Sequence, residues 1–258
     1  MIRMVLVWVA TLIPSTLTPH ASTLFIKQGT TLNRHMGRHF EIPAGSLTTF
    51  FALSLLVSVI VYDKVVVRIL RRFTGNPRGI TILQRMGIGM AIQVLTMAVA
   101  SITDMKRISV VKAQGLQGNE KAVAPLTVFI LLPQFVLGGI AETLFEGGKL
   151  EFFYDQAPES MQSIGTALYA STLGIGNFLT TFLLNISNNI SGRKGHSSWL
   201  LNNLNASRIY YYYALVAILS FINFIFFLLV SRSYAYKREA NKALSAMDMD
   251  CMDVDVQQ

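Results

Sequence analysis

Residues 221–230 read FINFIFFLLV, and Asn223 is the single polar residue among them. A helix in the core of a soluble protein keeps a polar stripe at helical spacing, which this stretch lacks. Residues 47–62, LTTFFALSLLVSVIVY, likewise contain only Ser and Thr as polar residues before the final Tyr. Both stretches therefore predict helices that lie in lipid.

The composition of the whole chain supports the same interpretation. Of its 258 residues, 52% are hydrophobic and 14% are charged, whereas soluble domains carry about 25% charged residues. Ordinary soluble domains and disordered chains are both excluded, because both are richer in charge. A helix needs roughly 20 apolar residues to cross a bilayer, so the chain can supply about six spans. The predicted fold class is an all-α, polytopic membrane protein.

Apolar stretches of nearly this length follow one another along the chain. The expected spans are residues 4–26, 45–69, 84–102, 126–148, 165–186 and 210–230. They form one membrane domain over residues 1–240, and residues 241–258 are expected to be a disordered, acidic, cytoplasmic tail. Pro14 and Pro19 interrupt the first span, where we expect the helix to be broken.

The orientation of the chain is not set by its charges alone. Lys and Arg are divided almost evenly between the loops of the two sides, so the positive-inside rule does not decide. Asn185, Asn189 and Asn205 each begin an N-x-S sequence between the last two spans. Such sequences are glycosylation acceptors. We therefore expect them on the extracytoplasmic side and both termini in the cytoplasm.

Two carboxylates lie inside the fourth expected span. Glu142 and Glu146 are one helical turn apart, and an ionisable residue within a span is a functional hypothesis because it is costly there. Two carboxylates on one helix face in a low dielectric resist ionising together, which is how a proton-binding site is built. For Glu146 the alternative is a position near the interface, paired with Lys149.

A cation for Glu142 is not evident in the sequence. No Lys or Arg lies at the middle of another expected span. Lys27, Asp63, Asp104 and Arg107 fall at span ends, where we expect their side chains to reach the interface. Glu142 is therefore either an unpaired buried carboxylate or one whose partner belongs to another polypeptide.

His20 follows Pro19 in the interrupted first span and has Ser and Thr residues around it. Broken helices line the substrate cavities of many transporters. A kinked helix packed on its neighbours, with its polar groups satisfied by the backbone, explains the same residues. Both interpretations stay open on the sequence.

Other polar features have simpler explanations. His35 and His39 have the spacing of metal ligands, but no third ligand is evident, so we expect a solvated pair and no metal site. Arg68, Arg71 and Arg72 form a basic helix face, interpreted as a loop that sets topology. A site for anionic lipid is the alternative.

The sequence offers no support for an enzyme. It has no phosphate-binding glycine loop, no nucleophile with a histidine at suitable spacing and no zinc pattern. Its single cysteine, Cys251, lies in the polar tail and cannot form a disulfide within the chain. Its basic residues flank apolar runs and do not form a nucleic-acid patch. We expect no catalytic residue, cofactor, metal or nucleic-acid partner.

Several stretches together resemble one known family. They are TLFIKQGTT (residues 23–31), RGITILQRMGIGM (78–90), GIAETLFEGGKLEFFYDQAPESMQSIGT (139–166), WLLNNLN (199–205) and SYAYK (233–237). In this order they resemble the C-terminal half of the plant nitrate/peptide transporter family, which are proton-dependent oligopeptide transporters of the major facilitator superfamily. The segment EFFYDQAPESM is the most specific of them.

The resemblance implies a transporter of twelve helices in two halves around a cavity, of which this chain supplies the last six. It implies proton-coupled symport of nitrate, small peptides or related solutes, across a plasma or vacuolar membrane. The expected partners are the bilayer, protons, a small solute, and an N-terminal half or a full-length homologue. The alternative is a truncated, non-transporting interaction partner of such a protein.

The resemblance also assigns roles to particular residues. Glu142 matches the family's tenth-helix glutamate, which pairs with a lysine on the fourth helix of the N-terminal half. Thr23 and Gln28 match a cavity-facing stretch on the seventh helix. Glu146 and Asp104 depart from the family pattern, which has an apolar or aromatic residue and Glu at these positions. Tyr210 also departs from it, standing where the family usually has Asp.

Overall fold

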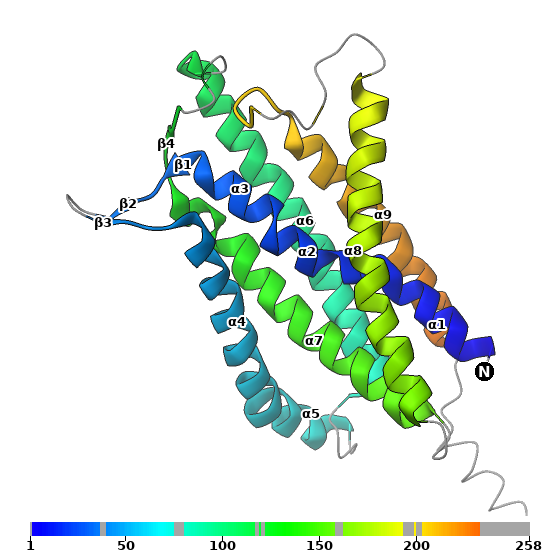
Figure 1. Ribbon diagram of the computed structural model, residues 1–258. Coiled ribbons are helices and arrows are strands. Elements are labelled where there is room, and N and C mark those ends of the chain that lie inside the picture. The colour runs from blue at the N-terminus through cyan, green and yellow to red at the C-terminus, as the bar shows by residue number, and fades with distance from the viewer. Residues whose placement is uncertain are drawn as a thin grey trace, which may run out of the picture.

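The computed structural model describes residues 2–36, 40–74, 80–116, 119, 122–157, 162–192, 199 and 203–232. Helices dominate this part of the chain (Figure 1). The α-helices are α1 (Ile2–Leu12), α2 (Leu17–Ser22), α3 (Leu24–Thr30), α4 (Leu47–Val61), α5 (Val67–Thr74), α6 (Ile82–Ala113), α7 (Leu132–Gln156), α8 (Gln162–Gly192) and α9 (Ile209–Arg232). The expected tail, residues 241–258, lies outside the described residues.

Short turns and strands connect these helices. The turns are η1 (Pro14–Thr16), η2 (Ala44–Ser46), η3 (Tyr62–Val66), which is a π-helix, and η5 (Val128–Leu131). The strands are β1 (Leu32–Asn33), β2 (His35–Met36), β3 (Phe40–Glu41) and β4 (Ala124–Thr127). β1 pairs in parallel with β4, and β2 pairs antiparallel with β3.

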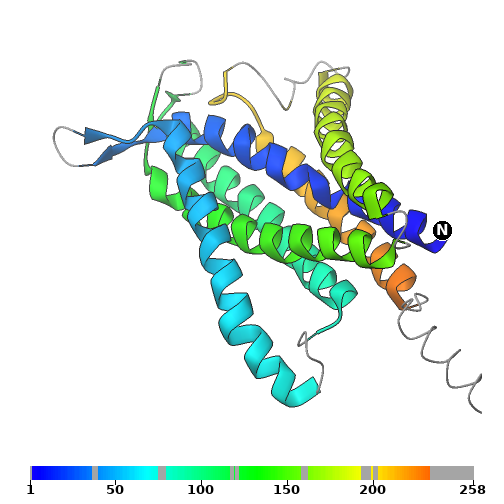
Figure 2. The ribbon, with the colours of Figure 1, turned by 60° about the horizontal axis from the view of Figure 1, so that its bottom comes forward.

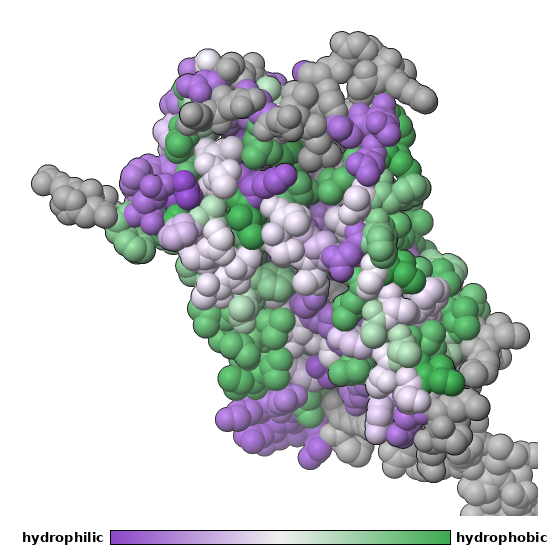
Figure 3. All heavy atoms as spheres, in the orientation of Figure 1, coloured by the Kyte–Doolittle hydropathy of each residue, from purple (hydrophilic) through white to green (hydrophobic). Residues whose placement is uncertain are grey.

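The prediction of a polytopic all-α membrane protein is confirmed. Six helical segments are long and apolar enough to cross a membrane, namely Met4–Thr30, Ala44–Arg72, Ile82–Ala113, Val128–Gln156, Gln162–Ile190 and Ile209–Arg232. Figure 3 shows apolar surface between two polar ends, with polar atoms also running through the centre of this face.

The spans differ in how much of each is covered by its neighbours. α6 and α7 lie side by side at the centre of the bundle, whereas α4 diverges from it towards α5 (Figure 2). In the apolar stretch of the second span 6% of residues are buried, against 56% in the apolar stretches of the third and fourth. The second span is thus far less covered than the third and fourth, although one side of α4 packs against Gly139 of α7. This exposure suits its almost uniformly apolar sequence.

The first span is broken where the sequence predicts it. Pro14 has no N–H, so the carbonyl of Ala10 loses its helical donor. The side-chain amide of Asn223 in α9 donates to this carbonyl instead, at 2.7 Å. Gln93 of α6 donates to the carbonyl of Pro14 at 2.8 Å. Two neighbouring spans therefore supply hydrogen bonds to the carbonyls at the break, as irregular backbone in a membrane requires.

Two glycines allow close helix contact. A Cβ on Gly139 of α7 would lie 2.7 Å from the carbonyl oxygen of Phe51 in α4. A Cβ on Gly176 of α8 would lie 2.5 Å from the carbonyl oxygen of Ser15 in η1. Only a residue without a side chain permits these approaches. The second contact presses α8 onto the broken part of the first span.

The third span extends well past the expected end at residue 102. Thr81 begins α6 with a reciprocal capping box to Gln84, which is a strong helix start. The helix then continues to Ala113 and contains Asp104 and Arg107, which are buried and pair with each other.

Candidate functional site

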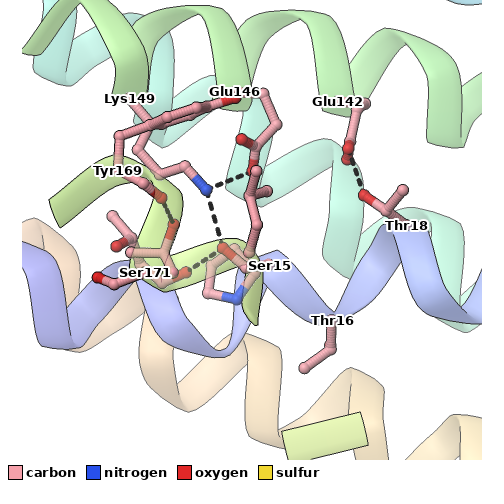
Figure 4. A network of polar contacts seen from close by, with 12 residues as sticks. Ser15, Thr16, Thr18, Glu142, Glu146, Lys149, Tyr169 and Ser171 are labelled. Atoms are coloured by element: carbon pink, nitrogen blue, oxygen red, sulfur yellow. Dashed lines mark hydrogen bonds and ion pairs between the residues drawn. The ribbon is translucent and has the colours of Figure 1, made fainter. Parts of the chain in front are cut away.

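Three ionisable residues of the fourth span share one face of α7. Glu142, Glu146 and Lys149 have the i, i+4, i+7 spacing that aligns side chains along a helix. Figure 4 shows them directed towards the broken segment of the first span. Glu142 is 8% exposed, and the side chains of Glu146 and Lys149 are 13% and 0% exposed. The cluster lies within the span Val128–Gln156.

Lys149 holds the centre of this cluster. Its Nζ lies 2.5 Å from Glu146 Oε1 and donates to Ser15 Oγ at 2.9 Å. It also lies 5.0 Å and 5.2 Å from the ring centroids of Phe145 and Tyr169, close enough for cation–π attraction. Lys149 therefore pairs with Glu146, but as a fully buried residue and not at the interface where the sequence had placed it.

The break in the first span positions Ser15 for this contact. Pro14 starts the turn η1, and the Ser15 hydroxyl donates to the carbonyl of Thr11 at 2.9 Å. This leaves the hydroxyl oxygen to accept from Lys149. A polar group is thereby available to the ammonium at membrane depth, where water is scarce.

Glu142 has a neutral partner among the described residues. Its Oε1 accepts a hydrogen bond from the hydroxyl of Thr18, which comes from α2 and is itself exposed (Figure 4). Glu142 also interacts electrostatically with Glu146 and Lys149. A cation therefore acts on Glu142 from within its own helix, although the hydrogen bond it accepts comes from a hydroxyl.

Four polar residues are exposed within the first and fifth spans, and one of them, Thr18, is bonded to the cluster. Thr18 and Ser22 on α2, and Asn177 and Thr181 on α8, are exposed within their spans. Thr18 donates to Glu142, and the other three donate to carbonyls of their own helices. Their remaining polar atoms are still better placed against polar groups than against lipid tails. We call these four exposed residues, of which Thr18 is bonded to Glu142, the polar face. Their side chains suit water, solute or protein better than hydrocarbon.

A second buried cluster corrects the expectation for Asp104 and Arg107. Both side chains are 0% exposed, and Arg107 Nη2 lies 2.8 Å from Asp104 Oδ1. Arg107 also donates to Thr31 Oγ1 at 3.1 Å and to the carbonyl of Leu204 at 3.2 Å. They do not extend to the interface, because each finds its charge partner one helical turn away. The i, i+3 spacing in the sequence was the signal that could have identified the pair.

The residues expected in a substrate cavity have different positions. Gln28 is buried, donates to Asp104 Oδ1 at 3.1 Å and accepts from Gln134 at 3.2 Å. His20 is buried, bonded to the carbonyl of Thr16 and, at 2.8 Å, to the hydroxyl of Tyr212. His20 is thus packed against its neighbours, the second of its two interpretations, whereas Gln28, placed at the cavity by the resemblance, is bonded within the Asp104 cluster. Thr23 is exposed.

The three glycosylation candidates differ in their exposure. Asn185 and Asn189 are exposed residues of α8. Asn205 is 1% exposed, and its amide donates to the carbonyls of Asn119 at 3.1 Å and Ala122 at 2.8 Å. A buried side chain with both amide hydrogens bonded is not open to a glycan, so Asn205 is no longer expected as an acceptor.

The remaining polar features lie at the ends of the bundle. The three arginines of α5, which follows α4 and the π-helix η3, are exposed: Arg68, Arg71 and Arg72. His35 is exposed in β2, and His39 lies outside the described residues. No group of three or more potential metal ligands occurs in the described part of the chain.

The fold and this site define a class of protein. Residues 1–200 match the sequence profile of the POT family, and the chain belongs to that family. It is an integral, multi-pass membrane protein. The resemblance inferred from the sequence is confirmed.

Particular relatives are similar over nearly the whole chain. Protein NRT1/PTR FAMILY 5.2 of Arabidopsis thaliana is 48% identical over 250 residues, which cover 97% of this chain and 43% of that protein. Protein NRT1/PTR FAMILY 5.1 of the same plant is 47% identical, over 92% of this chain and 40% of that protein. The chain thus spans about two fifths of the length of these relatives.

Solved structures show the same fold. An auto-inhibited POT family peptide transporter superposes with a TM-score of 0.70 at 20% identity, over 90% of this chain and 41% of that one. The POT family transporter PepTSo gives 0.62 at 23% identity, again over 90% of this chain and 41% of that one.

Proposed function

We propose that this chain is the C-terminal half of a proton-coupled symporter for nitrate, small peptides or related small solutes. The observation that carries the proposal is Glu142, a buried carboxylate in mid-span that adjoins the polar face. A carboxylate kept from bulk water exchanges its proton according to the charges that approach it. Glu142 therefore has the chemistry of a coupling residue.

The polar face supports the second part of the proposal. Its four hydroxyl and amide side chains are exposed within spans, and the relatives are more than twice as long as this chain. We infer that an N-terminal half covers this face and that the solute passes between the two halves. A cation from that half would compete with the proton for Glu142, linking proton binding to rocking of the halves.

We further infer that both termini are cytoplasmic and that the protein resides in a plasma or vacuolar membrane. The exposed arginines of α5 are consistent with a cytoplasmic, anionic lipid surface. Asn189, near the opposite end of α8, is consistent with an extracytoplasmic position.

The test joins this chain to the N-terminal half of the Arabidopsis relative NRT1/PTR FAMILY 5.2 in proteoliposomes. An acidic exterior should drive uptake of nitrate or a dipeptide together with acidification of the lumen. Glu142→Gln should abolish the proton-driven part, and Glu41→Gln, at the surface in β3, should retain it. Stable assembly of the two halves without uptake of any solute would instead favour a non-transporting interaction partner.

A further inference from the structure

The cluster on α7 carries an uneven number of charges. With every group ionised, Glu142, Glu146 and Lys149 sum to one negative charge. A buried site strongly favours neutrality, because an uncompensated charge in a low dielectric is costly. A single proton makes the cluster neutral. The geometry determines which carboxylate holds that proton.

Glu146 is the carboxylate bound to the lysine. Its Oε1 lies 2.5 Å from Lys149 Nζ, and the ammonium is held further by Ser15 Oγ and two aromatic rings. Such a close, charge-assisted contact is a strong hydrogen bond, and protonating Glu146 would break the ion pair. Glu142 instead accepts from the neutral hydroxyl of Thr18, so protonating Glu142 breaks no ion pair.

We propose that Glu146 and Lys149 form a resident ion pair that leaves Glu142 as the single proton carrier of the cluster. Lys149 is then a positioning residue that acts through Glu142 and sets the pH at which Glu142 carries its proton. This inference rests on the proposed function. The Glu146–Lys149 pair differs from a pairing of Glu142 with a cation of the N-terminal half, since Lys149 and both carboxylates belong to one helix.

The other charged and titratable groups near the cluster are accounted for. Tyr169 of α8 interacts with both carboxylates and is neutral near pH 7. Arg85 of α6 contacts a different face of α7, where it pairs with Glu151 at 3.5 Å and lies against Gly147. His20 of α2 is bonded to Tyr212 and Thr16. Within the described residues, Lys149 is the cation that acts on Glu142.

The proposal predicts opposite effects for two substitutions in the joined transporter. Lys149→Met leaves two carboxylates without a cation, so Glu142 ionises less readily. The pH profile of proton-driven uptake should move up by about one unit. Glu146→Gln leaves the ammonium to Glu142, which then ionises more readily. The profile should move down by about one unit.

The double variant Glu146→Gln/Lys149→Met removes both opposing charges and should return the profile close to that of the wild type. Lys149→Arg keeps the charge and should do the same. A shift of about one unit in either of these two variants overturns the proposal. If one single variant fails to assemble, the other decides: a shift in its stated direction supports the proposal, and an unmoved or oppositely moved profile overturns it.

The outcomes separate this inference from the proposed function. Absence of proton-driven uptake in the wild type would remove the proposed function itself. If the wild type transports and Glu142→Gln abolishes coupling, but both single variants shift the profile in the same direction or leave it unmoved, the resident ion pair alone is refuted.

Discussion

Asn223 of α9 donates its side-chain amide to the carbonyl of Ala10 in α1, at 2.7 Å. Ala10 has this free carbonyl because Pro14, four residues on, cannot donate to it. The single polar residue in the stretch FINFIFFLLV thus supplies the missing hydrogen-bond donor to a carbonyl 213 positions away in sequence. The last span thereby stabilises the break that positions Ser15 for Lys149.

Asn223→Leu should destabilise the protein, because it leaves a buried carbonyl without a donor. We expect a loss of about 1 kcal/mol, measured as a lower Tm of the purified chain in detergent. Asn177→Leu is the matched control, since the Asn177 amide donates to Leu173 of its own helix and is exposed. Equal losses of stability from both variants would argue against a stabilising hydrogen bond from Asn223 to Ala10.

Arg107→Gln should be strongly destabilising, with a loss of about 3–5 kcal/mol, because Asp104 remains as an unpaired buried charge. The double variant Asp104→Asn/Arg107→Gln should lose less than Arg107→Gln alone. Lys106→Gln, on the exposed side of α6, is the control. Thermal unfolding in detergent measures all three variants. If Arg107→Gln were as mild as Lys106→Gln, the side chain would be reaching the interface after all.

Gly139→Ala should lower the stability of the protein, whereas Gly174→Ala should not. The added methyl at Gly139 would meet the Phe51 carbonyl at 2.7 Å, whereas at Gly174 nothing lies within 4 Å. The first substitution should push α4 from α7 and lower the Tm. The second should be neutral or raise it, since alanine favours a helix by up to about 1 kcal/mol over glycine. An unchanged Tm for Gly139→Ala would show that α4 does not pack against α7 as described.

Asn189→Gln should remove a glycan when the protein is expressed in plant cells, detected as a loss of the glycosidase-sensitive mobility shift. Asn205→Gln should leave that shift unchanged and lower the Tm, because it disturbs two buried hydrogen bonds. Protease access to the C-terminal tail only from the extracytoplasmic side would reverse the orientation.

Much of this protein could be predicted from its sequence. Transfer of apolar side chains into lipid is a local, additive quantity, so hydropathy alone located the six spans. The spacing of Glu142, Glu146 and Lys149 on one helix face follows from helical periodicity. The break after residue 12 follows from Pro14, whose missing N–H is a property of the residue itself.

The partners of these groups were decided by the tertiary structure. Nothing local indicates that Asn223 meets Ala10, that Ser15 meets Lys149, or that Asn205 is buried and bonded to two distant carbonyls. Each such contact joins segments far apart in the chain, and its free energy exists only once the helices have packed. The sequence determined which groups needed a partner in the membrane, because an unsatisfied polar group there is costly. Packing alone decided which partner each one found.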